Sequence, residues 1–184
     1  MARVKTAVRL GVLAATAALP LLAAGQTVIR PAIPVQSEDT RYIKAVHGAL
    51  ELLRTQAPEE YVFTRRHVGR VLEVQRFDDV GMAVMHEPPM AKLRRREVLG
   101  SQTWLASVLV HEACHRFQYV RGVEKHGTKY PPNDEYYGQK AELECLKRQR
   151  HVLERLQAPA HEIAWVRDAD GMHYLYDEFG RRRR

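Results

Sequence analysis

Apolar side chains recur at helical spacing along the first segment after the N-terminal region of the chain. The repeat begins after Ser37, a residue suited to the N-cap of a helix, and stops at Pro58, which cannot continue one. The sequence therefore predicts a helix of about five turns between these two positions. Its apolar face consists of Tyr42, Ile43, Val46, Ala49, Leu50 and Leu53.

Residues 61–75 carry two competing signals. Their β-branched and aromatic side chains favour a strand, whereas Val68, Val71 and Leu72 follow a helical spacing. We favour a helix for this segment, and the strand is the alternative.

The segment Val80–His86 alternates between apolar and polar positions, as expected of a half-buried strand. The prolines at 88 and 89 then interrupt the pattern, and Met90–Leu93 follows as an apolar partner. The sequence predicts a short β-hairpin from these two strands.

The second half of the chain predicts further helices separated by Pro and Gly. Ser101 is suited to cap a strongly apolar helix from Gln102 to about Val120, and Gly127–Asn133 forms the following loop. A third helix is expected from about Asp134 to Leu156.

A fourth helix is expected over Ala160–Ala169. Pro159 stands near its start and Gly171 lies just beyond its end, which is the usual placement of these residues around a helix. A β-hairpin that turns at Asp170-Gly171 is the competing interpretation.

These elements predict an α+β fold, which consists of a mainly helical domain with a small β-hairpin ahead of the helix at Gln102. We expect the domain to cover residues 37–180. Residues 26–36 contain two prolines and are expected to form an extended leader, and the four arginines of 181–184 a solvated basic tail.

Residues 1–25 have the three parts of a secretory signal peptide. They begin with basic residues, continue through an uncharged apolar run, and end in the small residues Ala23, Ala24 and Gly25. Cleavage before Gln26 would release an exported protein, periplasmic or secreted. The alternative is a retained N-terminal membrane anchor, because no charge interrupts residues 10–29.

The charge distribution argues against a nucleic-acid binder. The chain has a formal net charge of +7, but the basic residues of 1–25 and 181–184 account for all of it. The remaining residues are balanced, and their one basic cluster is Lys92 with Arg94, Arg95 and Arg96. A phosphate-binding groove needs a clustered surplus of positive charge, so we expect no nucleic-acid partner.

The sequence His111-Glu112-Ala113-Cys114-His115 matches the H-E-x-x-H pattern inside a predicted helix. Histidines at positions i and i+4 lie on one helix face, so both imidazoles can reach one Zn²⁺. Glu112 would then lie beside the open coordination position. The same pattern also fits two histidines that are packed in a core.

A third protein ligand is expected from the third helix, where Glu142 and Glu144 are the candidates. On a helical projection Glu142 is centred on the apolar stripe, whereas Glu144 shares the polar face with Arg148. A carboxylate on a buried face requires a partner or a metal, so we select Glu142. His126 and Asp134 are alternative third ligands.

The pattern of Val110-His111-Glu112-x-x-His115 followed by a helix with a Glu resembles the zincin metallopeptidases of the gluzincin type. The resemblance implies a zincin-like domain in which His111, His115 and Glu142 bind zinc and Glu112 is the catalytic base. It covers residues 104–120 and 137–150. The sequence departs from the pattern at Arg116, where an uncharged residue is usual, and at Leu146, where some of these families have an Asp. Gln118 and Arg121 exclude the extended metzincin motif.

The two cysteines, Cys114 and Cys145, lie beside the expected ligands on the two helices. We expect them to form a disulfide in an exported protein. Two buried free thiols are the alternative.

The leading hypothesis is an exported zinc metallopeptidase that hydrolyses amide bonds of a peptide, protein or cell-wall peptide, with Zn²⁺ as cofactor. An exported helical binding or structural module with a non-catalytic metal site is the alternative. A membrane-surface protein that uses the basic tail is a third hypothesis. Possible oxyanion donors are His126, Tyr130, Tyr136, Tyr137 and His173.

Overall fold

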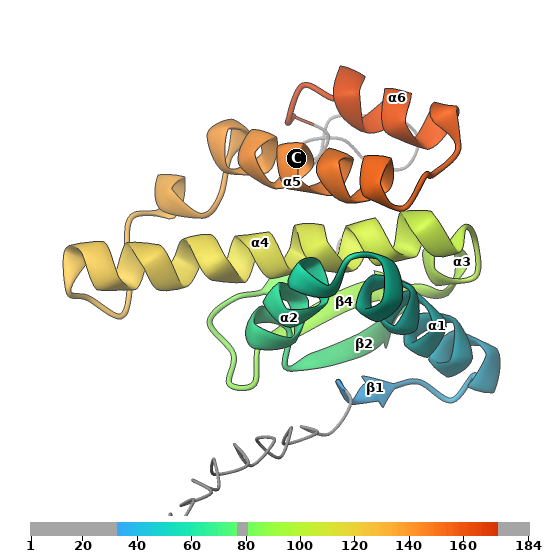
Figure 1. Ribbon diagram of the computed structural model, residues 1–184. Helices are drawn as coiled ribbons and strands as arrows, with labels where there is room; N and C mark the ends of the chain where they lie inside the picture. The colour runs from blue at the N-terminus through green and yellow to red at the C-terminus, as the bar shows by residue number, and fades with distance from the viewer. Residues whose placement is uncertain (1–32, 77–80, 173–184) are drawn as a thin grey trace, which may run out of the picture. The chain divides into compact units, whose positions relative to one another are not determined.

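The computed structural model describes residues 33–76 and 81–172, all within the unit Pro31–Arg184 (Figure 1). The expected signal peptide, most of the extended leader, the basic tail and His173 lie outside the described residues. The described part has an α+β, mainly helical fold, as the sequence predicted. Among these residues, no helix combines the length and apolar character needed to cross a membrane.

A small mixed sheet has the strand order β1-β2-β4-β3. The strands are β1 (Val35–Gln36), β2 (Arg70–Val74), β3 (Gly81–Ala83) and β4 (Met90–Arg94). β3 and β4 pair antiparallel, which confirms the predicted hairpin, whereas β2 pairs in parallel with both β1 and β4. The end of the expected leader is therefore extended, as predicted, but it is also paired within the sheet.

The first helix, α1 (Thr40–Gln56), has Asp39 as its N-cap and not Ser37. The Asp39 carboxylate accepts the backbone N–H of Arg41, while the Ser37 hydroxyl accepts the backbone N–H of Asp39. Ser37 thus organises the turn before the helix, and the carboxylate satisfies one of the N–H groups left free in its first turn.

The prediction of a helix throughout residues 61–75 is wrong for its second half. The helix α2 (Pro58–His67) ends at Val68, which is extended, and the chain then enters β2. Val71 is fully buried there between the neighbouring strands β1 and β4. Sheet pairing on two sides outweighs the helical spacing of the apolar residues.

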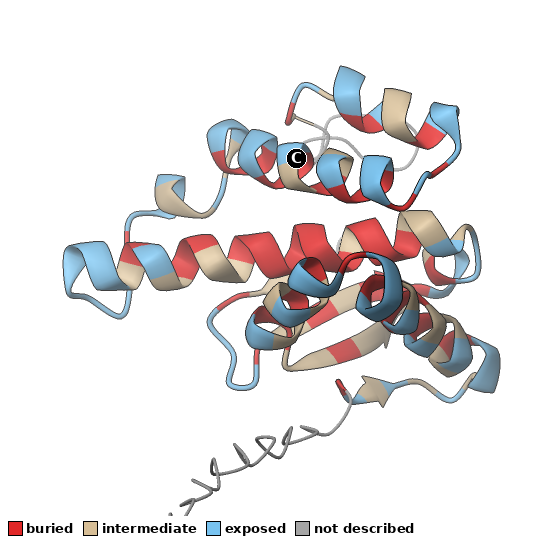
Figure 2. Cartoon of the chain, viewed as in Figure 1, coloured by how far each residue is buried: buried red, intermediate tan, exposed pale blue. Residues whose placement is uncertain are grey.

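The longest helix, α4 (Gln102–His126), begins at the expected N-cap Ser101, whose hydroxyl accepts the N–H of Trp104. It runs past the predicted end near Val120 and stops at Gly127, which has a left-handed φ of 61°. α4 packs against α1 and α2 on one side and α5 on the other (Figure 1). Figure 2 shows that buried residues follow one another along its middle.

The region after α4 differs from the predicted third helix at its start. A short 3-10 turn, η2 (Asn133–Glu135), comes first, and α5 (Gln139–Arg155) begins only after Gly138, whose φ is 94°. The positive φ of Gly138 prevents continuous helix from Asp134. The fourth helix is confirmed as α6 (Ala160–Asp168), which packs on α5.

One further short helix, α3 (Arg95–Val98), was not expected. The Glu97 carboxylate accepts the backbone N–H and the guanidinium of Arg94, which fixes the turn from β4 into α3. Part of the basic cluster of residues 92–96 therefore belongs to β4 and α3, and Arg95 pairs with Glu73.

Candidate metal centre

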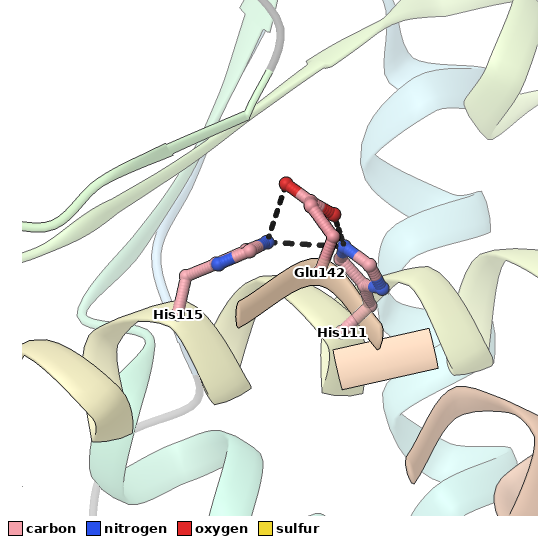
Figure 3. Close-up of side chains that lie close together, drawn as sticks. All are labelled: His111, His115 and Glu142. Carbon is pink, nitrogen blue, oxygen red and sulfur yellow. Dashed lines mark hydrogen bonds and ion pairs between the residues drawn. The ribbon is translucent and has the colours of Figure 1, made fainter. Parts of the chain in front are cut away.

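Three side chains from two helices converge between α4 and α5. His111 and His115 stand one turn apart on α4, and Glu142 comes from the first turn of α5. Figure 3 shows both imidazoles directed at the Glu142 carboxylate. The structure thus brings together the three metal ligands chosen from the sequence, and among the described residues this is the one group of donors with such spacing.

The distances between the donor atoms are short and nearly equal. The Nε2 atoms of His111 and His115 are 3.1 Å apart. Glu142 Oε2 lies 3.3 Å from Nε2 of His111, and Glu142 Oε1 lies 3.5 Å from Nε2 of His115. In an ideal tetrahedral zinc site with metal–ligand distances of about 2.05 Å, neighbouring donors are about 3.3 Å apart. The three residues could therefore hold one metal ion between them.

Glu142 occupies the buried face of α5, as the helical projection predicted. It is 6% exposed, and its stripe neighbours Leu146, Gln149 and Leu153 are buried as well. Glu144 lies on the exposed side and forms a two-pronged ion pair with Arg121, with both N–O distances at 3.0 Å. This contrast confirms the placement that separated the two glutamates.

Burial and mutual contact shift the pKa values of the triad. Burial lowers the pKa of His111. Burial also opposes the charge on His115, but hydrogen bonding and attraction to Glu142 raise the pKa of His115 to about 9. Burial opposes ionisation of Glu142 too, yet the hydrogen bonds with both histidines hold its pKa well below the usual range. The triad thus keeps one carboxylate ionised inside the protein.

Glu112 is buried next to the ligands. It is 7% exposed, and its Oε2 atom has no hydrogen-bond partner among the described residues. Burial raises the pKa of this carboxyl to about 7, and the Glu142 charge acts in the same direction. A buried carboxylate oxygen without a hydrogen-bond partner is unfavourable, so the Oε2 atom of Glu112 raises the free energy of the folded site.

The side chains that lie beside the two candidate ligand histidines were not predicted from the sequence. The Sγ atom of Cys145 lies 3.8 Å from Nδ1 of His115, and Gln149 acts to raise the pKa of His111 against the effect of burial. Four residues after Glu142, where some gluzincin-type families have an Asp, this chain has Leu146. The usable signal was that Cys145 and Gln149 share the buried stripe of α5 with Glu142.

The expected disulfide is absent, because Cys114 and Cys145 are both free, buried thiols. The Cys145 sulfur instead hydrogen-bonds to Gln118 and contacts the His115 imidazole. The expectation was wrong because proximity of two helix positions in sequence projection does not bring two sulfurs to bonding distance.

The alternative ligands and the possible oxyanion donors lie elsewhere. His126 pairs with Glu135 at 3.0 Å, and Asp134 belongs to the exposed η2 turn. The Tyr136 hydroxyl donates to Asn133, while Tyr130 and Tyr137 are more than half exposed. Neither His126 nor Asp134 joins the cluster around Glu142.

Arg116, the charged residue after the second histidine, has a structural explanation. Its guanidinium hydrogen-bonds to the Val84 carbonyl and forms an ion pair with Glu87, both in the connection from β3 to β4. The arginine therefore ties α4 to the hairpin and leaves the ligand positions unaffected.

Comparisons of the chain with known protein families, with curated proteins and with solved structures gave no match. The conclusions about the site therefore depend on its own geometry.

Proposed function

We propose that the chain is a zinc-dependent metallopeptidase. The single observation that carries the proposal is the combination of two imidazoles and a carboxylate close enough to share a metal ion with a second carboxyl at Glu112, whose Oε2 atom has no hydrogen-bond partner among the described residues. A structural metal site needs the first part but not the second. The N-terminal pattern of residues 1–25 supports an exported enzyme, periplasmic or secreted.

The donor chemistry supports zinc as the metal. Neutral imidazole nitrogens and a carboxylate oxygen suit zinc, and a site with three protein ligands retains one position for water or substrate. When bound, zinc would lower the pKa of a coordinated water and polarise a substrate carbonyl.

The residues of the chain divide the remaining work. His111, His115 and Glu142 hold the ion, and Glu142 contributes a negative charge that partly offsets that of the ion. Glu112 would accept a proton from the attacking water and return it to the leaving amine, which requires a carboxyl whose pKa lies near the working pH. Its raised pKa of about 7 is consistent with that role. The substrate would be a peptide, a protein or a cell-wall peptide.

One observation favours the alternative of a non-catalytic metal site in a binding or structural module. The four side chains of the site are each at most 9% exposed, namely His111, Glu112, His115 and Glu142. A substrate must reach the open coordination position, so the enzyme requires an opening between the hairpin and α4. A structural site would stay closed.

Substitution of Glu112 by Gln distinguishes the two functions. The variant keeps the size and hydrogen-bonding capacity of the side chain but cannot accept a proton from water. We expect zinc content and melting temperature to stay close to those of the wild type, while the cleavage rate on a peptide library falls at least about a hundredfold.

The matched control is Glu144→Gln, which changes an exposed glutamate and should leave the rate unchanged. Equal cleavage by wild type and Glu112→Gln would contradict the role of Glu112. Zinc-loaded wild type that cleaves neither peptides nor cell-wall peptides would support the non-catalytic site.

A further inference from the structure

A row of buried hydrogen bonds runs from the metal ligand His115 to a backbone carbonyl of α5. Nδ1 of His115 lies 3.8 Å from the Cys145 sulfur, which donates to Oε1 of Gln118 at 3.5 Å. The amide nitrogen of Gln118 then donates to the carbonyl of Ala141 at 3.0 Å. Cys145 and Gln118 are fully buried, so water does not compete for these bonds.

The direction of each bond in this row is determined from its far end. A backbone carbonyl can only accept, so the Gln118 group that faces Ala141 is the amide NH₂. The amide oxygen of Gln118 therefore faces Cys145 and must receive the proton of the thiol.

The direction of the Cys145 hydrogen bond also determines the hydrogen position on the His115 imidazole. A thiol has one proton, and because Cys145 gives it to Gln118, the sulfur can interact with His115 only as an acceptor. Nδ1 of His115 then carries a hydrogen, so the ring proton that metal binding would displace is the one on Nε2, which would leave the lone pair there. That atom is the one directed at Glu142 and His111.

We propose that Cys145 and Gln118 are positioning residues that hold His115 in the tautomer and orientation required for metal binding. The inference rests on the proposed metal centre, and it replaces the carboxylate that usually orients a ligand histidine with a neutral thiol and amide. The contact stabilises the productive ring orientation and adds no charge to the site.

The test compares the zinc affinity of the wild type with that of Cys145→Ala, by competition with a chromophoric chelator on the full chain. We expect the variant to bind zinc about tenfold to a hundredfold more weakly, the usual effect of losing a partner of a ligand histidine. Cys145→Ser should recover most of the affinity, because a hydroxyl also donates once and accepts. His151→Gln changes an exposed histidine and should leave the affinity unchanged.

The melting temperature of each metal-free variant separates positioning from folding. The inference requires that Cys145→Ala loses affinity while its metal-free form melts close to the wild type. If Cys145→Ala fails to fold, Gln118→Leu removes the acceptor of the thiol proton from the other end and should give the same loss.

Two further results would contradict either the positioning role of Cys145 or the metal centre itself. Wild-type affinity in Cys145→Ala, or no recovery in Cys145→Ser, would overturn the positioning role alone. A wild type that binds no zinc would overturn the metal centre as well, and with it this inference.

Discussion

His67 shows how a single side chain can be held uncharged inside this fold. It is 7% exposed and packs against the rings of Phe63 and Phe117. Burial and the nearby Arg66, Arg116 and Arg148 lower the pKa of His67 to about 4, from 6.5. Burial and three cationic neighbours therefore oppose its protonation.

This pKa predicts a pH-dependent loss of stability. Between pH 6.5 and about 4 the unfolded chain takes up a proton at His67 that the folded chain does not, so acidification through this window favours unfolding. His67→Phe removes the proton site and keeps the aromatic packing. We expect its urea midpoint to fall less than that of the wild type between about pH 7.5 and about pH 4.5.

The exposed residue His151 provides the control, since His151→Gln should follow the wild-type curve. An identical pH dependence for His67→Phe and wild type would contradict the account of His67.

The glutamates of α5 show what the sequence can predict about one residue. The helical projection distinguished Glu142 from Glu144 because the burial of a helix residue follows from its angular position around the helix axis. The role of Cys145 could not be predicted in the same way, since it depends on the amide orientation of Gln118 on another helix.

Among the elements, α4 is bounded by strong local signals. Its N-cap Ser101 was predicted correctly, and it ends at Gly127, where a Cβ would meet no heavy atom within 4 Å. The left-handed φ of 61° is therefore the one obstacle to a side chain at Gly127.

We expect Gly127→Ala to lower the free energy of unfolding by about 1 kcal/mol, the cost of placing an L-residue in the left-handed region. The matched control is Gly100→Ala, because Gly100 has no positive φ and a Cβ there would make only ordinary contacts, the nearest at 3.6 Å. Urea unfolding of both variants measures the difference. Equal stabilities would show that the terminus of α4 is not conformationally strained.

The elements that the sequence failed to predict depend on distant partners. The hairpin of β3 and β4 was recognised because its signals are local, whereas β2 becomes a strand through pairing with β1 and β4. The short helix α3 is an exception, because it depends on the local contact between Arg94 and Glu97, three residues apart. Local pattern therefore predicted α+β architecture but not the parallel sheet.

At the scale of the whole molecule, the candidate metal centre lies between two packed helices that have different neighbours. Apart from their contact with each other, α4 packs against α1, α2 and the sheet, and α5 packs against α6. A bound ion would link these parts through His111, His115 and Glu142. Metal binding should therefore stabilise the folded state as a whole.

Zinc removal is expected to lower the melting temperature of the wild type. A ligand present at about a hundred times its dissociation constant stabilises the native state by about 2.7 kcal/mol. Thermal unfolding with and without a chelator measures the shift, and Glu142→Ala should show none. A chelator effect of equal size in Glu142→Ala would place the metal elsewhere.

Zinc content per chain tests the central claim most directly. Metal analysis of purified protein after dialysis against dilute zinc should give close to one zinc per chain for the wild type and for Glu144→Ala. The variants His111→Ala, His115→Ala and Glu142→Ala should each retain almost none, because removal of one donor leaves two ligands. Zinc retained by Glu142→Ala but lost by Glu144→Ala, or no zinc in the wild type, would contradict the assignment of this centre.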